Sequence, residues 1–248
     1  MQNNRAVFAI VPAFDEAEAI GHVVHSLRSL RDELGRPLIT RVVVADNGST
    51  DGTGAIAMSA GAVVVREPRR GYGYACMAAI RAADDADILL FVDGDNSIVL
   101  EETPALLAAL DSETDLVIGA RVHADVGAMT LPQRFGNKLA CFITRIVWGT
   151  PISDLGPFRA IRKDAFVQLD MQDMTYGWTI EMQIKAFQLA QRVTEVPVSL
   201  RCRLGRSKIS GTVKGVIGAG IGILSMIAKL WWRERNRGMR LSPRVRRV

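Results

Sequence analysis

The stretch "LLFVDGDNS" (residues 89–97) places Asp93 and Asp95 directly after an apolar run that is typical of a buried strand. If the backbone stays extended, residues two apart project from the same side of the chain, so both carboxylates face one point. Gly94 lets the backbone come close to whatever they hold. Two carboxylates suit Mg²⁺ or Mn²⁺, which proteins often bind through one or two carboxylates plus substrate phosphates. The alternative is an Asp-rich turn, because Asp, Gly and Asn all favour turns.

This run is one of several short β-branched segments that alternate with helix-period segments over the first 120 residues. Such alternation predicts crossover helices and a largely parallel sheet, which is the doubly wound α/β class. The predicted strands are 6–11, 41–46, 62–67, 87–93 and 115–120. Between the first two strands, helical spacing predicts a sheet-facing stripe of Ile20, Val23, Val24, Leu27, Leu30 and Leu34.

The segments that follow the first four strands are polar or rich in glycine: "PAFDE", "DNGSTDGT", "PRRGYG" and "DGDNS". Ligands of open α/β sheets gather beyond the carboxyl ends of the strands, so we expect all four segments in one crevice. Asp46 could accept a hydrogen bond from the N–H edge of uracil or guanine. The amides and arginines of the third segment could hold diphosphate oxygens.

After residue 120 the pattern predicts helices at 132–148 and 177–190 and a strand at 193–203. Residues 215–232 are then apolar on every side except at Lys229, over about 27 Å if helical, which is the lower edge of a bilayer-spanning length. Lys229 and four glycines weaken a spanning interpretation. Trp231 and Trp232 before a basic tail favour a membrane-associated helix. The pattern leaves open whether this helix spans the membrane, lies on it or packs on another chain in a homo-oligomer.

The net charge of +5 is concentrated at the C-terminus, where residues 229–248 carry eight Lys or Arg and one Glu. A basic tail can bind nucleic acid or an anionic membrane surface, and the apolar segment before it favours the membrane over nucleic acid. Three cysteines without a CxxC pair argue against a disulfide framework or structural zinc and fit a reducing compartment. The five-residue apolar run ending at Val11 is too short for a signal-peptide core, so we expect a cytosolic N-terminal region.

The segments "VPAFDEAEAI", "VVVADNGSTDGT", "RGYGYACMAAI", "FVDGDNS" and "IGARV", in this order and spacing, resemble the family 2 glycosyltransferases of the GT-A fold. The dolichyl-phosphate mannose synthase-like branch is the nearest, and the resemblance covers roughly residues 6–214. It implies a GT-A domain at 1–210, with a mostly parallel sheet flanked by helices, followed by the apolar helix and polybasic tail at 211–248. It also implies that Asp93 and Asp95 hold a divalent metal, Mg²⁺ or Mn²⁺, on the donor diphosphate.

The same resemblance implies a nucleotide-sugar pocket formed by Pro12, Phe14, Glu16, Asp46, Arg70, Asp93, Gly94 and Asp95. Two departures from the family pattern stand out. Asp15 occupies a position where the family usually has Asn, and "DGDNS" replaces the commoner "DAD" form.

Downstream, "ISDLGPFRAIRKDAF" and "YGWTIEMQIKA" resemble family segments that make Asp154 and Glu181 candidate catalytic carboxylates, whereas Arg159 is expected to be structural. Either carboxylate could instead be the buried partner of an arginine. "RCRLGRSKISGT" resembles the Arg-x-x-x-Ser-Lys signature of polyprenyl-phosphate transferases. It implies an acceptor phosphate site, to which we also assign three upstream cations, so that the predicted set is Arg121, Arg134, Lys138, Arg203, Ser207 and Lys208. A solvated basic loop is the alternative for the signature.

The predicted helix at 132–148 gives a separate indication of the acceptor. Arg134, Lys138 and Arg145 fall within about 40° of one another, and a second stripe of apolar residues lies about 100° away: Phe135, Leu139, Phe142 and Ile146. A cationic stripe beside an apolar one fits a lipid phosphate at an interface. An ordinary amphipathic surface helix is the alternative.

Together these features predict a metal-dependent, inverting transfer of a hexose from a nucleotide diphosphate sugar, of the GDP-mannose or UDP-glucose type, to polyprenyl or dolichyl phosphate. The enzyme would be cytoplasmic and peripherally associated with the cytosolic face of a membrane. A phosphate acceptor is already an anion and needs no general base. One alternative is a soluble hydroxyl acceptor, with Asp154 or Glu181 as base. The other is a nucleotide-sugar-binding protein or membrane scaffold without catalysis.

Overall fold

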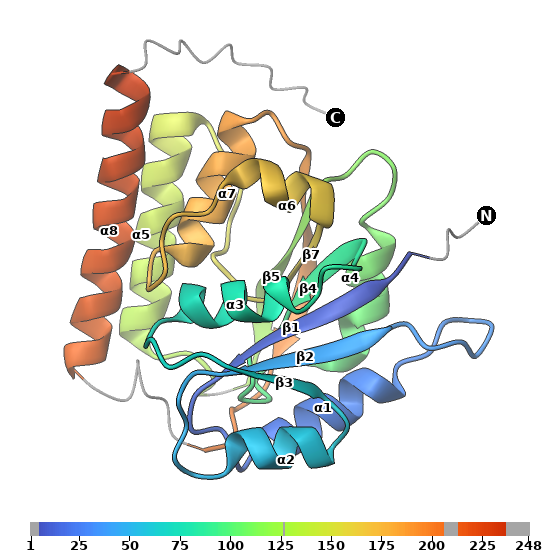
Figure 1. Ribbon diagram of the computed structural model, residues 1–248. Helices are drawn as coiled ribbons and strands as arrows, with labels where there is room; N and C mark the ends of the chain where they lie inside the picture. The colour runs from blue at the N-terminus through green and yellow to red at the C-terminus, as the bar shows by residue number, and fades with distance from the viewer. Residues whose placement is uncertain (1–4, 126, 206–212, 237–248) are drawn as a thin grey trace.

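The sheet has the strand order β3-β2-β1-β4-β6-β5-β7 in the computed structural model, which describes residues 5–125, 127–205 and 213–236 (Figure 1). Its strands are β1 (Val7–Ala13), β2 (Arg41–Asp46), β3 (Val63–Arg66), β4 (Ile88–Phe91), β5 (Leu116–Ala124), β6 (Arg159–Arg162) and β7 (Val193–Leu200). Within the described sheet, only β6 runs antiparallel to its neighbours. The prediction of a mostly parallel α/β sheet is therefore confirmed.

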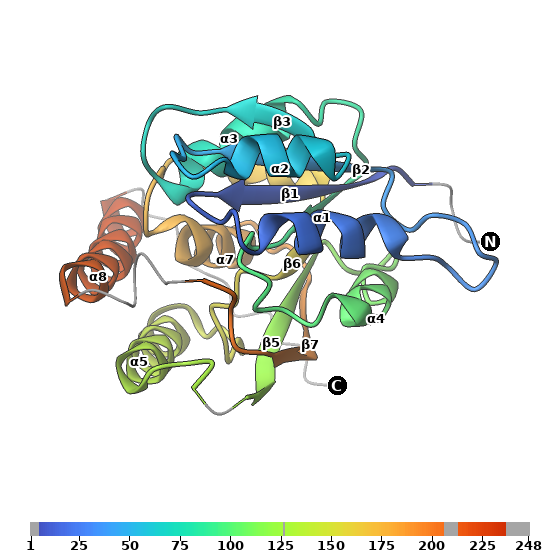
Figure 2. The same ribbon diagram turned by 90° about the horizontal axis from the view of Figure 1, so that it is seen from below.

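Helices cover both faces of this sheet. They are α1 (Ile20–Ser29), α2 (Thr53–Ser59), α3 (Tyr72–Arg81), the 3-10 turn η1 (Leu100–Glu102), α4 (Thr103–Ala108), α5 (Leu131–Trp148), α6 (Lys163–Leu169), α7 (Trp178–Gln188) and α8 (Val213–Asn236). One core cluster joins the sheet to α1, α2 and α4, and another joins it to α3, α6 and α7. Figure 2 shows α5 and α8 beyond α7 at one end of the sheet, where a third cluster forms.

Strand β1 shows why these segments are continuously apolar. Its alternate residues enter different clusters, Val7 and Ala9 on one face and Phe8 and Ile10 on the other. Every residue of β1 is buried, because helices lie over both faces. The five strands predicted within the first 120 residues are all present, with ends that differ by a few residues.

After residue 120 the structure adds one strand and shortens a predicted one. Strand β6 was not predicted, because it is short and has an arginine at each end, Arg159 and Arg162. The strand predicted at 193–203 ends at Leu200, since the chain then leaves the sheet for the loop after β4. There the Arg201 N–H donates to the Ser97 carbonyl at 2.9 Å.

The predicted sheet-facing stripe is correct as far as Leu30, which packs against the core cluster, and wrong at Leu34. Helix α1 ends at Ser29, and Leu34 is 75% exposed. The Asp32 carboxylate accepts the backbone N–H groups of Leu34 and Arg36, which closes a turn in place of further helix.

Helix α8 extends the predicted apolar segment by a few residues at each end. Its Met226, Ile227 and Leu230 are buried in the cluster with α5 and α7, whereas Ile221 and Trp232 are exposed. Over the described ranges, none of the helices combines the length and hydrophobicity needed to cross a membrane. The division of the chain at residue 210 stays a prediction, and α8 packs on the helices of the preceding part.

Candidate active site

The carboxyl ends of β1 to β4 meet at one edge of the sheet, as predicted. These four strands are parallel and adjacent, and the register pairs Ala13 with Asp46 and Asp46 with Arg66. The polar segments that follow the strands are therefore neighbours, and the hydrogen bonds described below join them.

Asn47 fastens the end of β2 to the loop that carries Arg70. Its Nδ2 donates to the carbonyls of Glu67, at 2.9 Å, and Arg69, at 2.6 Å, and its Oδ1 accepts the Gly71 N–H at 2.9 Å. The Arg70 guanidinium then lies 3.6 Å from the centroid of the Phe14 ring.

Asp46, Pro12 and Glu16 border the same region. Asp46 is only 7% exposed and accepts the Ser49 N–H at 2.8 Å. A Cβ at Gly94 would lie 3.3 Å from the Pro12 carbonyl oxygen, so β1 and the loop after β4 touch. The structure thus brings the predicted nucleotide-sugar residues together beyond the carboxyl ends of these strands, where the ligand crevice is expected.

The departure at Asp15 has a backbone explanation. Asp15 has φ of +50°, a conformation that Asn and Asp tolerate better than most residues. Its N–H donates to the Ser49 hydroxyl at 3.0 Å, and its Oδ1 accepts the Thr50 N–H at 2.8 Å. Asp15 therefore ties the segment after β1 to the segment after β2 at this turn.

The carboxylates of Asp93 and Asp95, in the loop after β4, repel each other electrostatically. Burial and the nearby charge of Asp95 raise the pKa of Asp93 to about 7, while Arg121 and Arg203 act in the opposite direction. Oδ1 of Asp93 accepts the Tyr72 hydroxyl at 3.1 Å. Oδ1 of Asp95 accepts the N–H and hydroxyl of Ser97 at 3.0 and 2.7 Å.

These residues fit a divalent cation. Carboxylate oxygens are the hard donors that Mg²⁺ and Mn²⁺ prefer, and a bound cation would relieve the repulsion that raises the pKa of Asp93. In the part of the chain that the structure describes, no group of three or more His, Cys, Asp or Glu is arranged to hold a metal. The two aspartates would therefore need further oxygens from a diphosphate and water.

Asp154 is the partner of Arg121, one of the two alternatives raised by its sequence. The guanidinium binds both carboxylate oxygens at 2.7 Å, and the Arg121 N–H adds a bond of 2.9 Å. Burial opposes ionisation, but these bonds outweigh it and hold the pKa of Asp154 below its ordinary value. From α5, the Asn137 side chain accepts the Leu155 N–H at 2.8 Å and so fixes the segment.

Glu181 is held differently, by a lysine and two backbone amides. Its fully buried carboxylate accepts the N–H groups of Gln172 and Asp173 at 3.0 and 2.7 Å and pairs with Lys185 at 2.8 Å. These contacts anchor the loop 171–177, which lies against the start of α3. The structure does not bring Glu181 to the Asp93 and Asp95 carboxylates through any contact among the described residues.

Arg159 has the structural contacts expected of it. It is 1% exposed and donates to the carbonyls of Gly156 and Thr179. Burial lowers the pKa of its guanidinium to about 10.

The predicted acceptor residues are divided between the crevice and the surface. Arg203 reaches the crevice, where it pairs with Glu16 at 2.7 Å and Asp95 at 3.3 Å. Arg134 and Lys138 lie exposed on α5. Ser207 and Lys208 lie outside the described residues.

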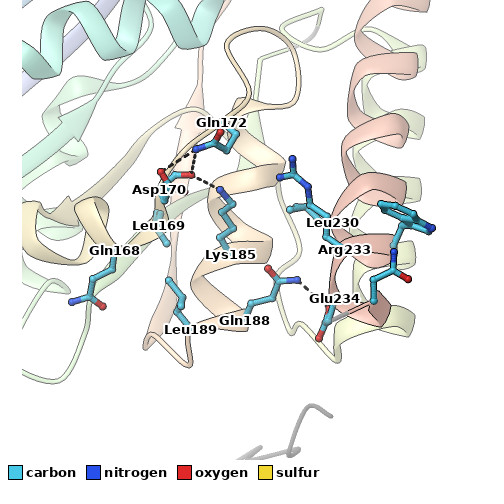
Figure 3. Close-up of a pocket in the computed structure, with 12 residues that line it drawn as sticks. Gln168, Leu169, Asp170, Gln172, Lys185, Gln188, Leu189, Leu230, Arg233 and Glu234 are labelled. Atoms are coloured by element: carbon cyan, nitrogen blue, oxygen red, sulfur yellow. Dashed lines mark hydrogen bonds between the residues drawn. The ribbon is translucent and has the colours of Figure 1, made fainter. Parts of the chain in front are cut away.

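A cavity of about 580 Å³ lies elsewhere, between the ends of α6, α7 and α8 (Figure 3). Lys185 points toward Asp170 there and donates to its carbonyl, and Gln188 donates to Glu234 at 3.0 Å. None of the predicted site residues lines this cavity. It is therefore not the nucleotide-sugar crevice.

Four polar residues with roles in the site were not singled out from the sequence: Asn47, Tyr72, Ser97 and Asn137. The first three lie within the quoted motifs, so their position in those motifs was a signal. Asn137 had no local signal, because its partner Arg121 comes 16 residues earlier in the chain.

Comparison with known proteins gives consistent results. The model of a family described as glycosyl transferase family 2 matches residues 8–169. An uncharacterised glycosyltransferase of Mycobacterium tuberculosis is 34% identical over 215 residues, which cover 86% of this chain and 93% of that protein. The dolichyl-phosphate hexose transferase of Haloferax volcanii is 29% identical over 231 residues, covering 92% of this chain and 95% of that one.

Among solved structures, the fold is similar to glucosyl-3-phosphoglycerate synthase from Mycobacterium tuberculosis, in complex with Mn²⁺, UDP and phosphoglyceric acid. The TM-score is 0.73 with 22% identity, over 96% of this chain and 81% of that one. At this level of identity the likeness concerns the fold.

Proposed function

The chain belongs to glycosyltransferase family 2 and has a GT-A-like fold, and from that premise we propose that it transfers a hexose from a nucleotide diphosphate sugar to a polyprenyl phosphate. The transfer would invert the anomeric carbon, because the acceptor phosphate attacks from the side opposite the leaving diphosphate.

The observation that supports this proposal is how the two candidate bases, Asp154 and Glu181, are hydrogen-bonded and paired. Asp154 is bound at both oxygens by Arg121 and has a lowered pKa, so it is a poor proton acceptor near neutral pH. The Glu181 carboxylate is fully buried, accepts two backbone N–H groups and pairs with Lys185. A hydroxyl acceptor needs a base to remove its proton, whereas a phosphate monoester does not. The contacts therefore favour a phosphate acceptor.

On the donor side, Asp46 would accept the N–H edge of the base, and Phe14 and Arg70 would border the nucleotide. Asp93 and Asp95 would hold a divalent metal, which when bound would stabilise the negative charge of the leaving diphosphate. The crevice cations Arg121 and Arg203 would keep the acceptor phosphate beside the donor, because their charge offsets the repulsion between the two anions.

The outer surface of α5 supports a lipid acceptor. Leu131, Phe135, Phe142 and Ile146 are each at least 60% exposed and alternate with Arg134, Lys138 and Arg145 on one face of the helix. No acidic residue interrupts α5, which has the sequence LPQRFGNKLACFITRIVW. Such a face suits the surface of a bilayer, where anionic headgroups lie over an apolar interior.

Helix α8 has an exposed face of the same apolar and basic character. Its outer side exposes Ile221, Leu224, Trp231 and Trp232, and its last turns carry Arg233 and Arg235. Figures 1 and 2 both place α8 beside α5, and the two helices are in contact. We therefore assign the exposed faces of α5 and α8, called the docking face below, to the cytosolic surface of an anionic membrane. The enzyme would be cytoplasmic and peripheral.

The relatives offer support for two acceptor classes. The Haloferax relative is named for transfer of a hexose to dolichyl phosphate. The fold neighbour is a synthase of glucosyl-3-phosphoglycerate and binds phosphoglyceric acid, a soluble molecule that also carries a phosphate. A soluble acceptor is accordingly the second candidate.

A screen read by mass spectrometry tests the proposed reaction. The purified chain is incubated with GDP-mannose or UDP-glucose, Mg²⁺ or Mn²⁺, and polyprenyl phosphate or phosphoglyceric acid. We expect a glycosylated lipid phosphate that depends on donor and metal. Glycosylation of the soluble acceptor alone would replace the proposal with the second candidate, and binding without turnover across the panel would indicate a non-catalytic protein.

Vesicle sedimentation tests the docking face. The double variant Phe135→Ser, Phe142→Ser should lose most of its binding to vesicles that contain phosphatidylglycerol. Leu34→Ser is the control, since it removes an apolar side chain that is at least as exposed as these two, from the turn after α1. Equal binding by the double variant and the control would place the membrane contact elsewhere.

A further inference from the structure

Arg203 occupies a bridging position between two parts of the crevice. Its Nη2 lies 2.7 Å from Oε1 of Glu16, in the segment after β1, and its Nη1 lies 3.3 Å from Oδ2 of Asp95, in the loop after β4. The guanidinium thus sits on one of the two carboxylates assigned to the metal.

Both oxygens of Asp95 are engaged in this arrangement. Oδ1 accepts the N–H and hydroxyl of Ser97, and Oδ2 faces Arg203. A cation that binds Asp95 through Oδ2 must therefore compete with the guanidinium. Two cations on one carboxylate oxygen repel each other unless an anion lies between them.

The backbone that carries Arg203 is fixed to the same loop. Leu204 N–H donates to the Asp95 carbonyl at 3.0 Å, and Arg201 N–H donates to the Ser97 carbonyl at 2.9 Å. The long Arg203 side chain can change its direction while its Cα stays beside the loop. Its Nε is buried and has no hydrogen-bond partner among the described residues, so the present position does not satisfy the guanidinium completely.

We propose that Arg203 is an internal counter-ion of the metal site: it neutralises Asp95 in the free protein and leaves it when a divalent cation and the donor diphosphate bind. The released guanidinium then becomes available to the acceptor phosphate. This inference rests on the proposed function and adds an order of substrate binding to it, because donor and metal must bind before Arg203 can hold the acceptor.

The consequence for metal affinity is opposite to that of an ordinary site residue. Loss of a residue that only supports the site weakens metal binding, whereas loss of an internal competitor strengthens it. Arg203→Gln should therefore bind Mn²⁺ more tightly than the wild type in the absence of nucleotide. We expect a change of about tenfold, the equivalent of about 1.4 kcal/mol.

Arg201→Gln is a matched control. Arg201 lies two residues away, pairs with Glu101 at 2.9 Å and makes the same change in net charge when substituted. A general effect of charge would appear in both variants, so Arg201→Gln should stay within about twofold of the wild type. Arg203→Lys, which keeps the charge but loses the fork that bridges two carboxylates, should lie between wild type and Arg203→Gln.

The measurement is the free Mn²⁺ signal in electron paramagnetic resonance during titration of the full chain with Mn²⁺ alone, then with Mn²⁺ and UDP or GDP. The advantage of Arg203→Gln should shrink when nucleotide is present. Unchanged or weaker Mn²⁺ affinity in both Arg203 variants would overturn the counter-ion role while leaving the proposed function intact. Absence of Mn²⁺ binding in every protein, wild type included, would overturn the metal site itself and this inference with it.

Discussion

At the scale of single residues, Asp93 and Asp154 have opposite electrostatic environments. Asp93 has a pKa raised to about 7 by burial and Asp95, and Asp154 has a pKa lowered by Arg121 despite its burial. A raised pKa means that the folded protein must hold a charge it disfavours once the pH passes that value. A lowered pKa means that the charge is stabilised by folding.

The first prediction concerns stability without metal. The raised pKa of Asp93 contributes stability below the ordinary value of 3.8, and this contribution is lost as pH rises to about 7. Asp93→Asn should therefore raise the melting temperature relative to wild type, by an amount that grows between about pH 4 and 7 and is constant above. Calorimetry in chelator at several pH values checks this.

Asp154→Asn is the informative counterpart, because it should lower the melting temperature at pH 7 by leaving the largely enclosed Arg121 without its charge partner. The stability that the Asp154 carboxylate gives the wild type is present above its ordinary pKa and lost as pH falls through its lowered value. A melting temperature that falls in both variants would contradict the account of Asp93.

Tyr72 gives the second prediction. Its hydroxyl donates to Oδ1 of Asp93, so Tyr72→Phe removes one hydrogen bond from the proposed metal ligand without emptying the space of the ring. A hydrogen bond to a charged group contributes about 1.5–3 kcal/mol, so kcat/KM for the donor should fall by roughly tenfold or more.

Tyr74→Phe, on the same helix, is the control. The Arg69 guanidinium lies 4.5 Å from the centroid of the Tyr74 ring, and the Tyr74 hydroxyl has no role in the proposed metal site. Steady-state kinetics with the two variants side by side decides the matter. Equal rates for Tyr72→Phe and wild type would remove Tyr72 from the site.

At the scale of elements, the strands that could be predicted are those whose own residues carry a recognisable pattern. Strands β1, β2, β4 and β5 are recognisable because helices cover both faces of the sheet and make the central residues of these strands apolar, and β3 is recognisable by its run of three valines. Strand β6 was not predicted because it contains a buried arginine. The Arg159 guanidinium donates to the carbonyls of Gly156 and Thr179, and Thr179 lies in α7. A local sequence pattern does not predict a buried arginine whose hydrogen-bond acceptor lies 20 residues further along the chain.

The candidate site shows the same division. The residues of the strand ends were predictable because parallel strands bring their carboxyl ends to one edge. The contact of Arg203 with Glu16 spans 187 residues and depends on the chain leaving β7 at Leu200. The resemblance placed both residues in the site, but it did not predict that they pair with each other.

Glu181 supplies the third prediction, at the level of a helix and a loop. Its carboxylate anchors residues 172 and 173, and the loop lies so close to α3 that a Cβ at Gly71 or Gly73 would come within 2.5 Å of a loop carbonyl. Glu181→Gln should lower the melting temperature and speed hydrogen exchange in the loop 171–177, because Lys185 and the amides lose a charged partner.

Lys185→Met should have the same two effects, since it breaks the same pair from the other side and leaves the buried Glu181 charge without its lysine. Hydrogen exchange followed by mass spectrometry measures the loop directly. Loss of turnover in Glu181→Gln with exchange and melting temperature unchanged would restore Glu181 as a candidate base.

At the scale of the whole molecule, α5 connects the two surfaces that the proposed reaction needs. One side of the helix holds Asn137, which contacts Arg121 and the segment around Asp154. The other side exposes Phe135 and Phe142 on the docking face. A lipid phosphate drawn from a membrane at this face would therefore approach the cations beside Asp93 along one helix.

The proposed acceptor is an anion that needs no base, and a comparison of paired acceptors tests this chemistry. Initial rates are measured with one donor sugar and Mg²⁺, on a polyprenyl phosphate and on the polyprenol of the same chain length, both in the same detergent. The two lipids differ only in the phosphate. We predict glycosylation of the phosphate and none of the alcohol. Turnover of the alcohol at a rate equal to or above that of the phosphate would contradict the account.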